Sequence, residues 1–124
     1  MAIIFDSEKK IFKLDTATSS YIFQIYEQDY LVHLYYGAKI PDTNVDGLKY
    51  RGGFPSFSPN NINVDDWMFS ADVTPLEYSG EGTGDFRTSA FSVRNADGNN
   101  STDVRYKSHK IYKGKPAING MPSL

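Results

Sequence analysis

Hydrophobic and polar positions alternate with a period of two over much of this chain, which is typical of strands rather than helices. Residues 21–26 and 30–36 are rich in β-branched and aromatic side chains, which fit a pleated surface, and the polar residues 27–29 separate them. The pattern predicts an antiparallel hairpin with a short loop. We expect an earlier strand around Phe12 and Leu14.

The second strand of this hairpin is largely apolar on both of its faces. Strict alternation places Leu31, His33 and Tyr35 on one face and the even-numbered residues of 30–36 on the other. A strand that is apolar on both sides favours burial between two layers. The pattern therefore predicts a sandwich strand that is covered on both faces.

The second half of the chain repeats these signals. Residues 90–94 and 102–113 alternate as strands do, and the polar cluster 95–100 between them contains Asp97-Gly98, a frequent hairpin turn. Residues 41–66 form a long irregular segment that is rich in Pro, Gly and Asn, and long loops in small domains are often functional. With no ten-residue stretch of helical spacing, we predict an all-β fold, an antiparallel β-sandwich without an internal domain boundary.

Composition narrows the function classes. The 124 residues carry 13 Lys and Arg against 15 Asp and Glu, so the net charge of −2 gives no electrostatic support for nucleic-acid binding. There is no cysteine and there are only two histidines, so we expect no metal site and no cofactor. No apolar run approaches the ~18 residues of a membrane helix, and no secretory signal is visible. We therefore expect no membrane association and a cytoplasmic location.

Two kinds of side chain offer chemistry. Glycosidases use pairs of carboxylates, and Asp65, Asp66, Glu77, Glu81 and Asp85 are available, but their spacing selects no pair. Aromatic side chains in the irregular segments offer faces on which sugar rings stack, and they are also common as core anchors of long loops. The single tryptophan, Trp67, is the strongest candidate for a binding role.

Several motifs, taken in order, resemble the N-terminal region of bacterial α-galactosidases of glycoside hydrolase family 36. The resemblance extends along nearly the whole chain. The motifs in their order and spacing are more specific together than any one of them is alone. They are Tyr21-Ile22-Phe23-Gln24, residues 30–37, Phe57-Ser58-Pro59-Asn60, Glu77-Tyr78, Gly84-Asp85-Phe86-Arg87, residues 102–106 and residues 109–116.

The resemblance implies a large N-terminal β-sandwich, a (β/α)₈ barrel and a small C-terminal β domain in the intact protein. The barrel of such enzymes supplies an aspartate nucleophile and an aspartate acid/base, which cleave terminal α-galactosides of the melibiose and raffinose type with retention. No part of residues 1–124 matches the barrel motifs. The resemblance thus implies an early part of the larger sandwich domain, with the catalytic barrel and all catalytic residues absent.

The resemblance also implies a supporting role. Related enzymes are often tetramers in which sandwich loops of one subunit help to close a neighbouring active site. Phe54 stands where such enzymes can carry an aspartate that contacts the sugar, which is a departure from their pattern, and Trp67 lies near another substrate-side position. Both are expected to contact substrate in trans, and a homo-oligomer is expected.

Three hypotheses follow. The first is a non-catalytic N-terminal fragment of an α-galactosidase, which shapes oligomer contacts and the mouth of the pocket and binds an α-galactoside only in the intact enzyme. The second is a free-standing carbohydrate-binding β module, which the loop aromatics and small size support. The third is a purely structural or interaction protein. The abrupt ending at Leu124 favours the first, and open strand edges then predict self-association of the isolated chain.

Overall fold

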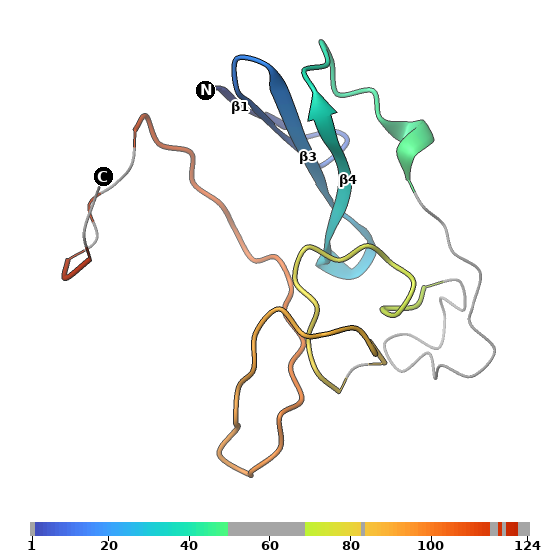
Figure 1. Cartoon of the computed structure of the whole chain (residues 1–124), viewed down its shortest axis with the longest axis vertical. Helices are drawn as coiled ribbons and strands as arrows, with labels where there is room; N and C mark the ends of the chain where they lie inside the picture. Colours follow the sequence, from blue (N-terminus) through green and yellow to red (C-terminus); the bar gives the residue numbers. More distant parts are fainter. Residues whose placement is uncertain (1, 50–68, 83, 115–116, 118, 122–124) are drawn as a thin grey trace.

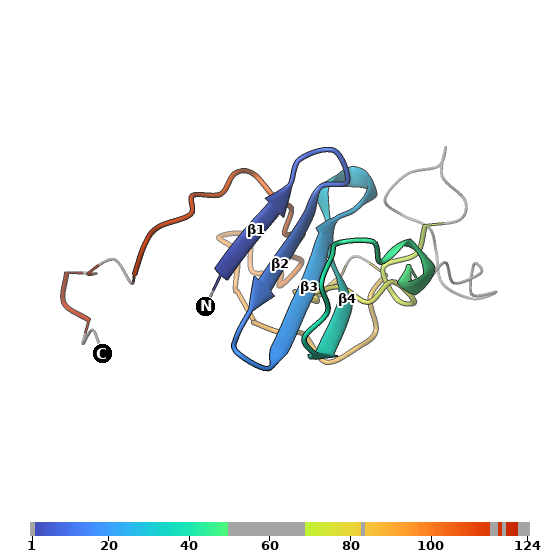
Figure 2. The ribbon, with the colours of Figure 1, turned by 90° about the horizontal axis from the view of Figure 1, so that it is seen from above.

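The computed structural model describes residues 2–49, 69–82, 84–114, 117 and 119–121. Its sheet has four antiparallel strands that pair in the order in which they occur along the chain. Figures 1 and 2 show the strands side by side in one layer. The strands are β1 (Ala2–Asp6), β2 (Ile11–Asp15), β3 (Ser19–Ile25) and β4 (Leu31–Ala38), and two short 3₁₀ turns are η1 (Glu27–Asp29) and η2 (Asp46–Leu48).

The structure confirms the all-β class, the hairpin and the strand before it. The polar residues that separate the two predicted strands form η1, between β3 and β4. β1 was not expected. Its apolar residues Ile3, Ile4 and Phe5 pair with Leu14, Lys13 and Phe12 of β2, so the first hairpin extends the sheet by one strand.

One face of the sheet carries a small aliphatic core. Ile11, Ile22, Leu34 and Val45 are buried together, and Tyr35 packs against them. Val45 comes from the segment just before η2, so this segment covers the face. Burial of these side chains stabilises the sheet, since each contributes roughly 1.5–3 kcal/mol.

A buried ion pair lies on the same face as this core. Lys13, whose side chain is 2% exposed, donates from Nζ to Asp15 Oδ2 over 2.8 Å, and Ser20 Oγ donates to Asp15 Oδ1 over 2.7 Å. The Lys13 ammonium and the Ser20 hydroxyl lower the pKa of the Asp15 carboxyl. Ile40 N donates in turn to Ser20 Oγ, so the group links β2 and β3 to the chain after β4. Pairing and hydrogen bonding allow these charges to be buried.

The prediction for the faces of residues 30–36 is wrong at its C-terminal end. The β3–β4 register shifts at Ile22/Phe23, where Phe23 pairs with His33 and Ile22 pairs with Tyr35. This bulge places Leu34 and Tyr35 on the same face and moves Tyr36 to the face of His33, because one extra residue of β4 is inserted. Tyr36 is 71% exposed, so the predicted cover on both faces is also absent there in the described structure.

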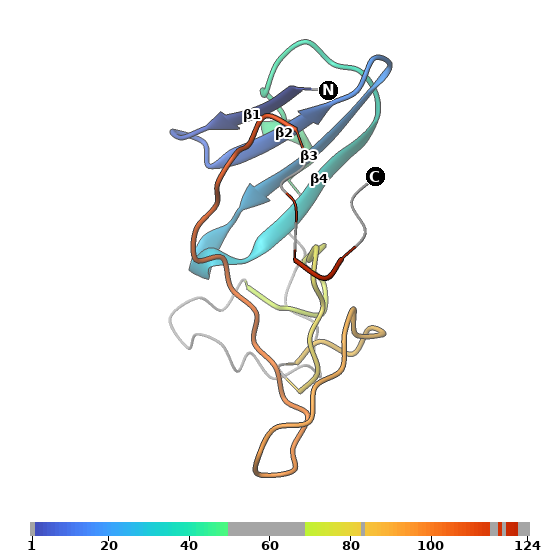
Figure 3. The ribbon, with the colours of Figure 1, turned by 90° about the vertical axis from the view of Figure 1, so that its left-hand side faces the viewer.

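The opposite face of the sheet is aromatic. The ring centroids of Phe5 and Phe12 are 4.5 Å apart, and those of Phe12 and Phe23 are 4.8 Å apart. His109 lies against both Phe5 and Phe12, at 4.5 and 4.7 Å. Figure 3 shows the segment before residue 110 crossing the sheet, and we call residues 103–109 the strap. The strap therefore covers the β1–β2 end of the aromatic face.

The strands predicted at 90–94 and 102–113 are not formed, although the turn at Asp97-Gly98 between them is. These segments are extended, but they do not pair with each other, and in the described chain their backbone makes only scattered hydrogen bonds. Thr102 N donates to Glu81 O and Tyr106 N donates to Asp29 O. Alternation predicts extended backbone, whereas a strand also needs an adjacent edge with which to pair.

Candidate functional site

Residues 75–77 lie along the free edge of β4 and bring the second half of the chain to the sheet. His33 N donates to Pro75 O over 2.8 Å, and Glu77 N donates to Leu31 O over 2.9 Å. Val32 and Leu76 form an antiparallel bridge between these bonds. The edge of β4 is thus extended by one short strand-like segment, which positions Glu77 and Tyr78 beside the aromatic face.

Glu77 joins two residues of the aromatic face. The Tyr21 hydroxyl donates to Glu77 Oε2, and His33 Nδ1 lies 3.1 Å from Glu77 Oε1. Burial, followed by the hydrogen bond to Glu77, raises the pKa of Tyr21, so the phenol keeps its proton and remains the donor. The side chains of His33 and Glu77 are 38% and 16% exposed. Both carboxylate oxygens of Glu77 are therefore used to hold residues 75–77 on the sheet.

The candidate acids that the structure describes do not form a common pair. Glu81 accepts from Ser89 Oγ over 3.1 Å, and Asp85 accepts two hydrogen bonds from the Arg87 guanidinium. The remaining candidates, Asp65 and Asp66, lie outside the described residues. Glu77, Glu81 and Asp85 each contact a different set of partners, so each of these carboxylates has its own structural role.

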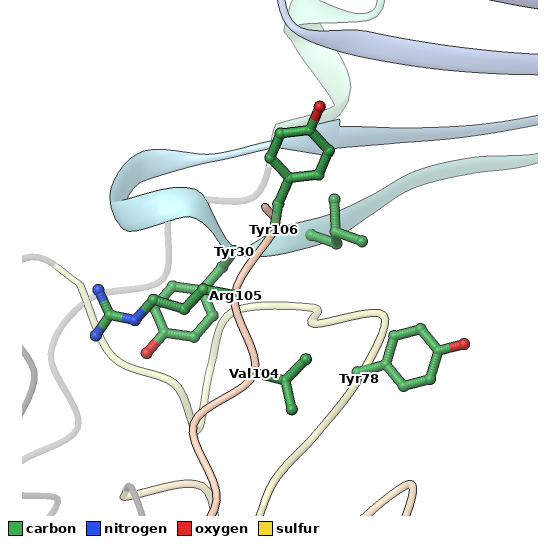
Figure 4. A pocket seen from close by; sticks show the side chains of 6 residues that line it. Tyr30, Tyr78, Val104, Arg105 and Tyr106 are labelled. Atoms are coloured by element: carbon green, nitrogen blue, oxygen red, sulfur yellow. The ribbon is translucent and has the colours of Figure 1, made fainter. Parts of the chain in front are cut away.

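A small apolar pocket lies where the strap meets β4. It has a volume of about 150 Å³ and is lined by Tyr30, Leu31, Tyr78, Val104, Arg105 and Tyr106. Figure 4 shows Val104 between the Tyr30 ring and Tyr78. Because the lining is mainly apolar, the pocket suits a single aliphatic or aromatic group, and the residues that line it include no carboxylate and no histidine.

Tyr30 fixes one wall of this pocket. Its hydroxyl donates to Asp103 Oδ1 over 2.5 Å, and its ring stacks on Phe69 with centroids 5.2 Å apart. The Arg105 guanidinium carbon lies 5.0 Å from the Tyr30 ring centroid, within cation–π range. Burial, followed by the bond to Asp103, raises the pKa of Tyr30. These contacts attach the strap and the segment after residue 68 to the start of β4.

The two predicted substrate-contacting residues, Trp67 and Phe54, lie outside the described residues. The chain on the C-terminal side of Trp67 is held firmly, because Phe69, Ser70 and Ala71 are all at most 4% exposed. Thr74 Oγ1 donates to Ser70 O over 2.7 Å and reinforces this turn. The chain after Trp67 is therefore anchored within two residues, and the roles of Trp67 and Phe54 stay predictions.

The contact between Tyr21, His33 and Glu77 was missed by sequence reasoning, which treated His33 as a packed or surface histidine and Glu77 as a loop acid. Glu77 is 56 residues from Tyr21 and 44 from His33, and no local spacing signals such a contact. Among the described residues, no three His, Asp or Glu side chains are grouped to hold a metal ion. No helix in the same part of the chain is long and apolar enough to cross a membrane.

Comparison with known families identifies the sequence. The profile of the glycosyl hydrolase family 36 N-terminal domain matches residues 29–124. This chain belongs to glycoside hydrolase family 36. It is 39% identical to α-galactosidase AgaA of Geobacillus stearothermophilus over 127 aligned residues, which cover 99% of this chain and 17% of that enzyme. It is 42% identical to α-galactosidase Mel36A of Lactobacillus acidophilus over 120 residues, which cover 97% of this chain and 16% of that enzyme.

Solved family 36 structures share this fold. The crystal structure of α-galactosidase AgaB from G. stearothermophilus superposes with a TM-score of 0.85 at 39% identity, covering 99% of this chain and 16% of that one. A variant of AgaA has been solved in complex with raffinose, and it matches with a TM-score of 0.80 over 92% of this chain. The predicted family is confirmed, and the chain spans about one-sixth of the length of these relatives, in their N-terminal region.

Proposed function

We propose that residues 1–124 are the N-terminal, non-catalytic part of an α-galactosidase that hydrolyses terminal α-galactosides with retention. The observation that carries this proposal is the similarity of the whole chain to the N-terminal regions of enzymes described as α-galactosidases. The proposal places the aspartate nucleophile and the aspartate acid/base on a barrel outside residues 1–124. The separate engagement of Glu77, Glu81 and Asp85 by their own partners supports this division.

The proposed substrates are α-galactosides of the melibiose and raffinose type. AgaA variants have been solved with raffinose and with stachyose, which supports this substrate class for a 39% identical relative. The proposed setting is the cytoplasm, since residues 1–124 contain no cysteine that could form a disulfide. No metal or cofactor is needed for double displacement by two carboxylates.

The chain itself is proposed to form homo-oligomer contacts, within a tetramer, and to shape the mouth of the substrate pocket. Trp67 and Phe54 are the residues proposed to contact sugar in a neighbouring subunit. The support for these two residues is the resemblance together with their rings, since aromatic faces stack on the apolar faces of sugar rings.

The test compares the full polypeptide with residues 1–124 alone, using hydrolysis of p-nitrophenyl α-galactoside. We expect turnover in the full polypeptide and none in the isolated residues. Turnover by residues 1–124 at a comparable rate would show that the catalytic pair lies within them. Galactoside binding by residues 1–124, with no turnover by the full polypeptide, would support a carbohydrate-binding module instead.

Variants of the full polypeptide test the two aromatic residues. Trp67→Ala and Phe54→Ala are each expected to raise KM several-fold, because loss of an aromatic contact in a binding site costs about 1 kcal/mol. Phe86→Ala is the matched control, since its ring is 72% exposed in the described structure. If KM is unchanged in both variants, the proposed contacts with substrate are wrong, even when the enzyme is an α-galactosidase.

A further inference from the structure

A polar cavity lies at the end of the sheet where the β1–β2 turn approaches η1. It has a volume of about 350 Å³ and is open to solvent on one side. Small-molecule pockets in proteins have volumes of roughly 300–1,000 Å³, so the space suits a ligand of monosaccharide size. Two bonds hold the turns together: Gln24 Nε2 donates to Lys9 O over 2.8 Å, and Ile25 N donates to Lys10 O over 2.9 Å.

Two glutamine side chains in this cavity have buried polar atoms without partners. Gln24 is only 7% exposed, and its Oε1 accepts no hydrogen bond. Both the Oε1 and the Nε2 of Gln28 are buried and unbonded. Buried amide atoms are normally satisfied. Both residues line the cavity, so a rotation of either side chain would turn these closed-off atoms toward a polar ligand there. Together they offer two acceptors and one donor group.

The backbone around the cavity is held in a rarely populated conformation. Lys10, Gln28 and Asp29 have φ values of 54°, 60° and 65°, and they are the non-glycine residues with positive φ in the described part of the chain. All three line the cavity. The strap holds this turn from the other side, since Tyr106 N donates to Asp29 O over 2.7 Å. Strained residues of this kind persist where the surroundings fix them, often at ligand contacts.

The charges around the cavity decide between classes of ligand. Its lining includes three ammonium groups, on Lys9, Lys10 and Lys49, and three carboxylates, on Glu8, Glu27 and Asp29. Lys49 is already paired with Asp46 over 2.9 Å. A multiply charged anion would meet the carboxylates and a cation would meet the ammonium groups. A neutral molecule whose hydroxyl groups both donate and accept hydrogen bonds fits the mixed lining and the two amides.

We propose that this cavity binds a neutral sugar, with Gln24 Oε1 and the amide of Gln28 as its specific hydrogen-bonding groups. The inference rests on the cavity, the orphaned amide atoms and the balance of charge, and it is independent of the α-galactosidase proposal. The ligand class is a monosaccharide or one unit of a longer saccharide.

Hydrogen exchange of the full polypeptide, measured peptide by peptide, tests the proposal because its readout is local. Galactose, glucose and myo-inositol at millimolar concentrations are the probes, and inorganic phosphate is the anionic comparison. We expect at least one of the neutral probes to slow exchange in peptides that contain residues 8–10 and 25–29, and we expect phosphate not to do so. Protection by phosphate alone, or by none of the probes, would overturn the proposal.

Two variants attribute this protection to the amides. Gln28→Met is expected to weaken sugar binding about tenfold, which is the loss of roughly one good hydrogen bond, and to leave Tm unchanged, since neither amide atom is bonded in the structure. Gln24→Met is expected to weaken binding similarly and also to lower Tm, because it removes the bond to Lys9 O. Asn100→Leu, an exposed change outside the cavity, is the control. Unchanged sugar affinity in Gln28→Met would show that the cavity does not bind sugar through this residue.

Discussion

The two halves of this molecule use similar amphipathic sequences in different ways. Residues 2–38 form a sheet in which neighbouring strands satisfy each other's backbone groups. Residues 69–114 form no strand of this sheet in the described structure apart from the short pairing of residues 75–77 with β4. Side chains hold them at a few further points: Glu77 on β3 and β4, Asp103 on Tyr30, and His109 on Phe5 and Phe12. The difference shows that period-two alternation specifies an extended backbone and a preferred face, while the presence of a partner edge decides whether a strand forms.

The largest expected difference between the two halves is in the cost of removing an isoleucine side chain. Ile22→Ala should lower the free energy of unfolding by about 3 kcal/mol, because Ile22 is fully buried against Ile11 and Leu34. Ile111→Ala should change it by less than about 0.5 kcal/mol, since Ile111 is 49% exposed. Urea unfolding measures both. Equal costs would mean that residue 111 is buried in solution.

The next largest effect is expected when a side chain that anchors the second half of the chain is removed. The Arg87 guanidinium donates to both oxygens of Asp85 and to the carbonyls of Thr74 and Ala71, while the Asp85 side chain is fully buried. Arg87→Met should cost about 2 kcal/mol of unfolding free energy, because it leaves a buried carboxylate without its partner. Arg94→Met, at an exposed position, is the matched control. A similar small change in both variants would contradict the anchoring role.

A smaller effect is expected in the pH dependence of stability. The pKa values of Tyr21 and Tyr30 are raised in the folded state above the ordinary value of 10.0, mainly by burial and then by the bonds to Glu77 and Asp103. The folded state then binds more protons than the unfolded state at alkaline pH. The stabilisation is complete below pH 10 and is lost progressively as the pH rises above it.

Unfolding by urea across the alkaline range measures this loss. Tyr21→Phe and Tyr30→Phe should each reduce the fall in stability above pH 10, and each should cost about 1–2 kcal/mol at neutral pH through the lost hydrogen bond to a carboxylate. Tyr112→Phe is the control at neutral pH, because Tyr112 is 55% exposed. A wild-type curve that stays level through the alkaline range would contradict the bonded phenols.

The smallest expected change in folding stability comes from charging the exposed apolar residues of the second half. Val104, Ile111 and Tyr112 are between 45% and 55% exposed. When residues 1–124 are studied alone, we expect the segments that contain these residues to pair between copies of the chain. Light scattering should then report species larger than a monomer. Ile111→Lys should reduce this association with little effect on unfolding. A clean monomer at high concentration would show that the unpaired segments are protected in another way.

The hairpin could be predicted from sequence because its information is local. Residues 19–25 and 31–38 alternate, and the polar break between them coincides with η1. The bulge at Ile22/Phe23 could not, since it depends on how two strands fit together rather than on either strand alone. The burial of Lys13 could not be predicted from the sequence either. Lysine is normally exposed, and here its burial depends on the ion pair with Asp15.

The candidate sites show the same limit. The sequence identified Glu77 as a carboxylate in a loop. Its contacts with Tyr21 and His33 could not be predicted, because those two residues lie far from it along the chain. The polar cavity gave no sequence signal, because its lining comes from separate turns, and the positive φ values at Lys10, Gln28 and Asp29 fall on residues that are not glycines. Family resemblance supplied what local patterns could not, namely the N-terminal region of family 36 to which the chain belongs.

The pairing of strands in chain order has a consequence for how the protein is made. Each strand of the sheet needs only the strand synthesised just before it, so β1 to β4 can assemble once residue 38 has left the ribosome. The strap, whose His109 rests on Phe5 and Phe12, is translated several seconds later at about 5–20 residues per second. During that interval the strap does not yet cover the aromatic face of the nascent chain. This is therefore the stage of synthesis at which a chaperone would find the most exposed apolar surface on the sheet.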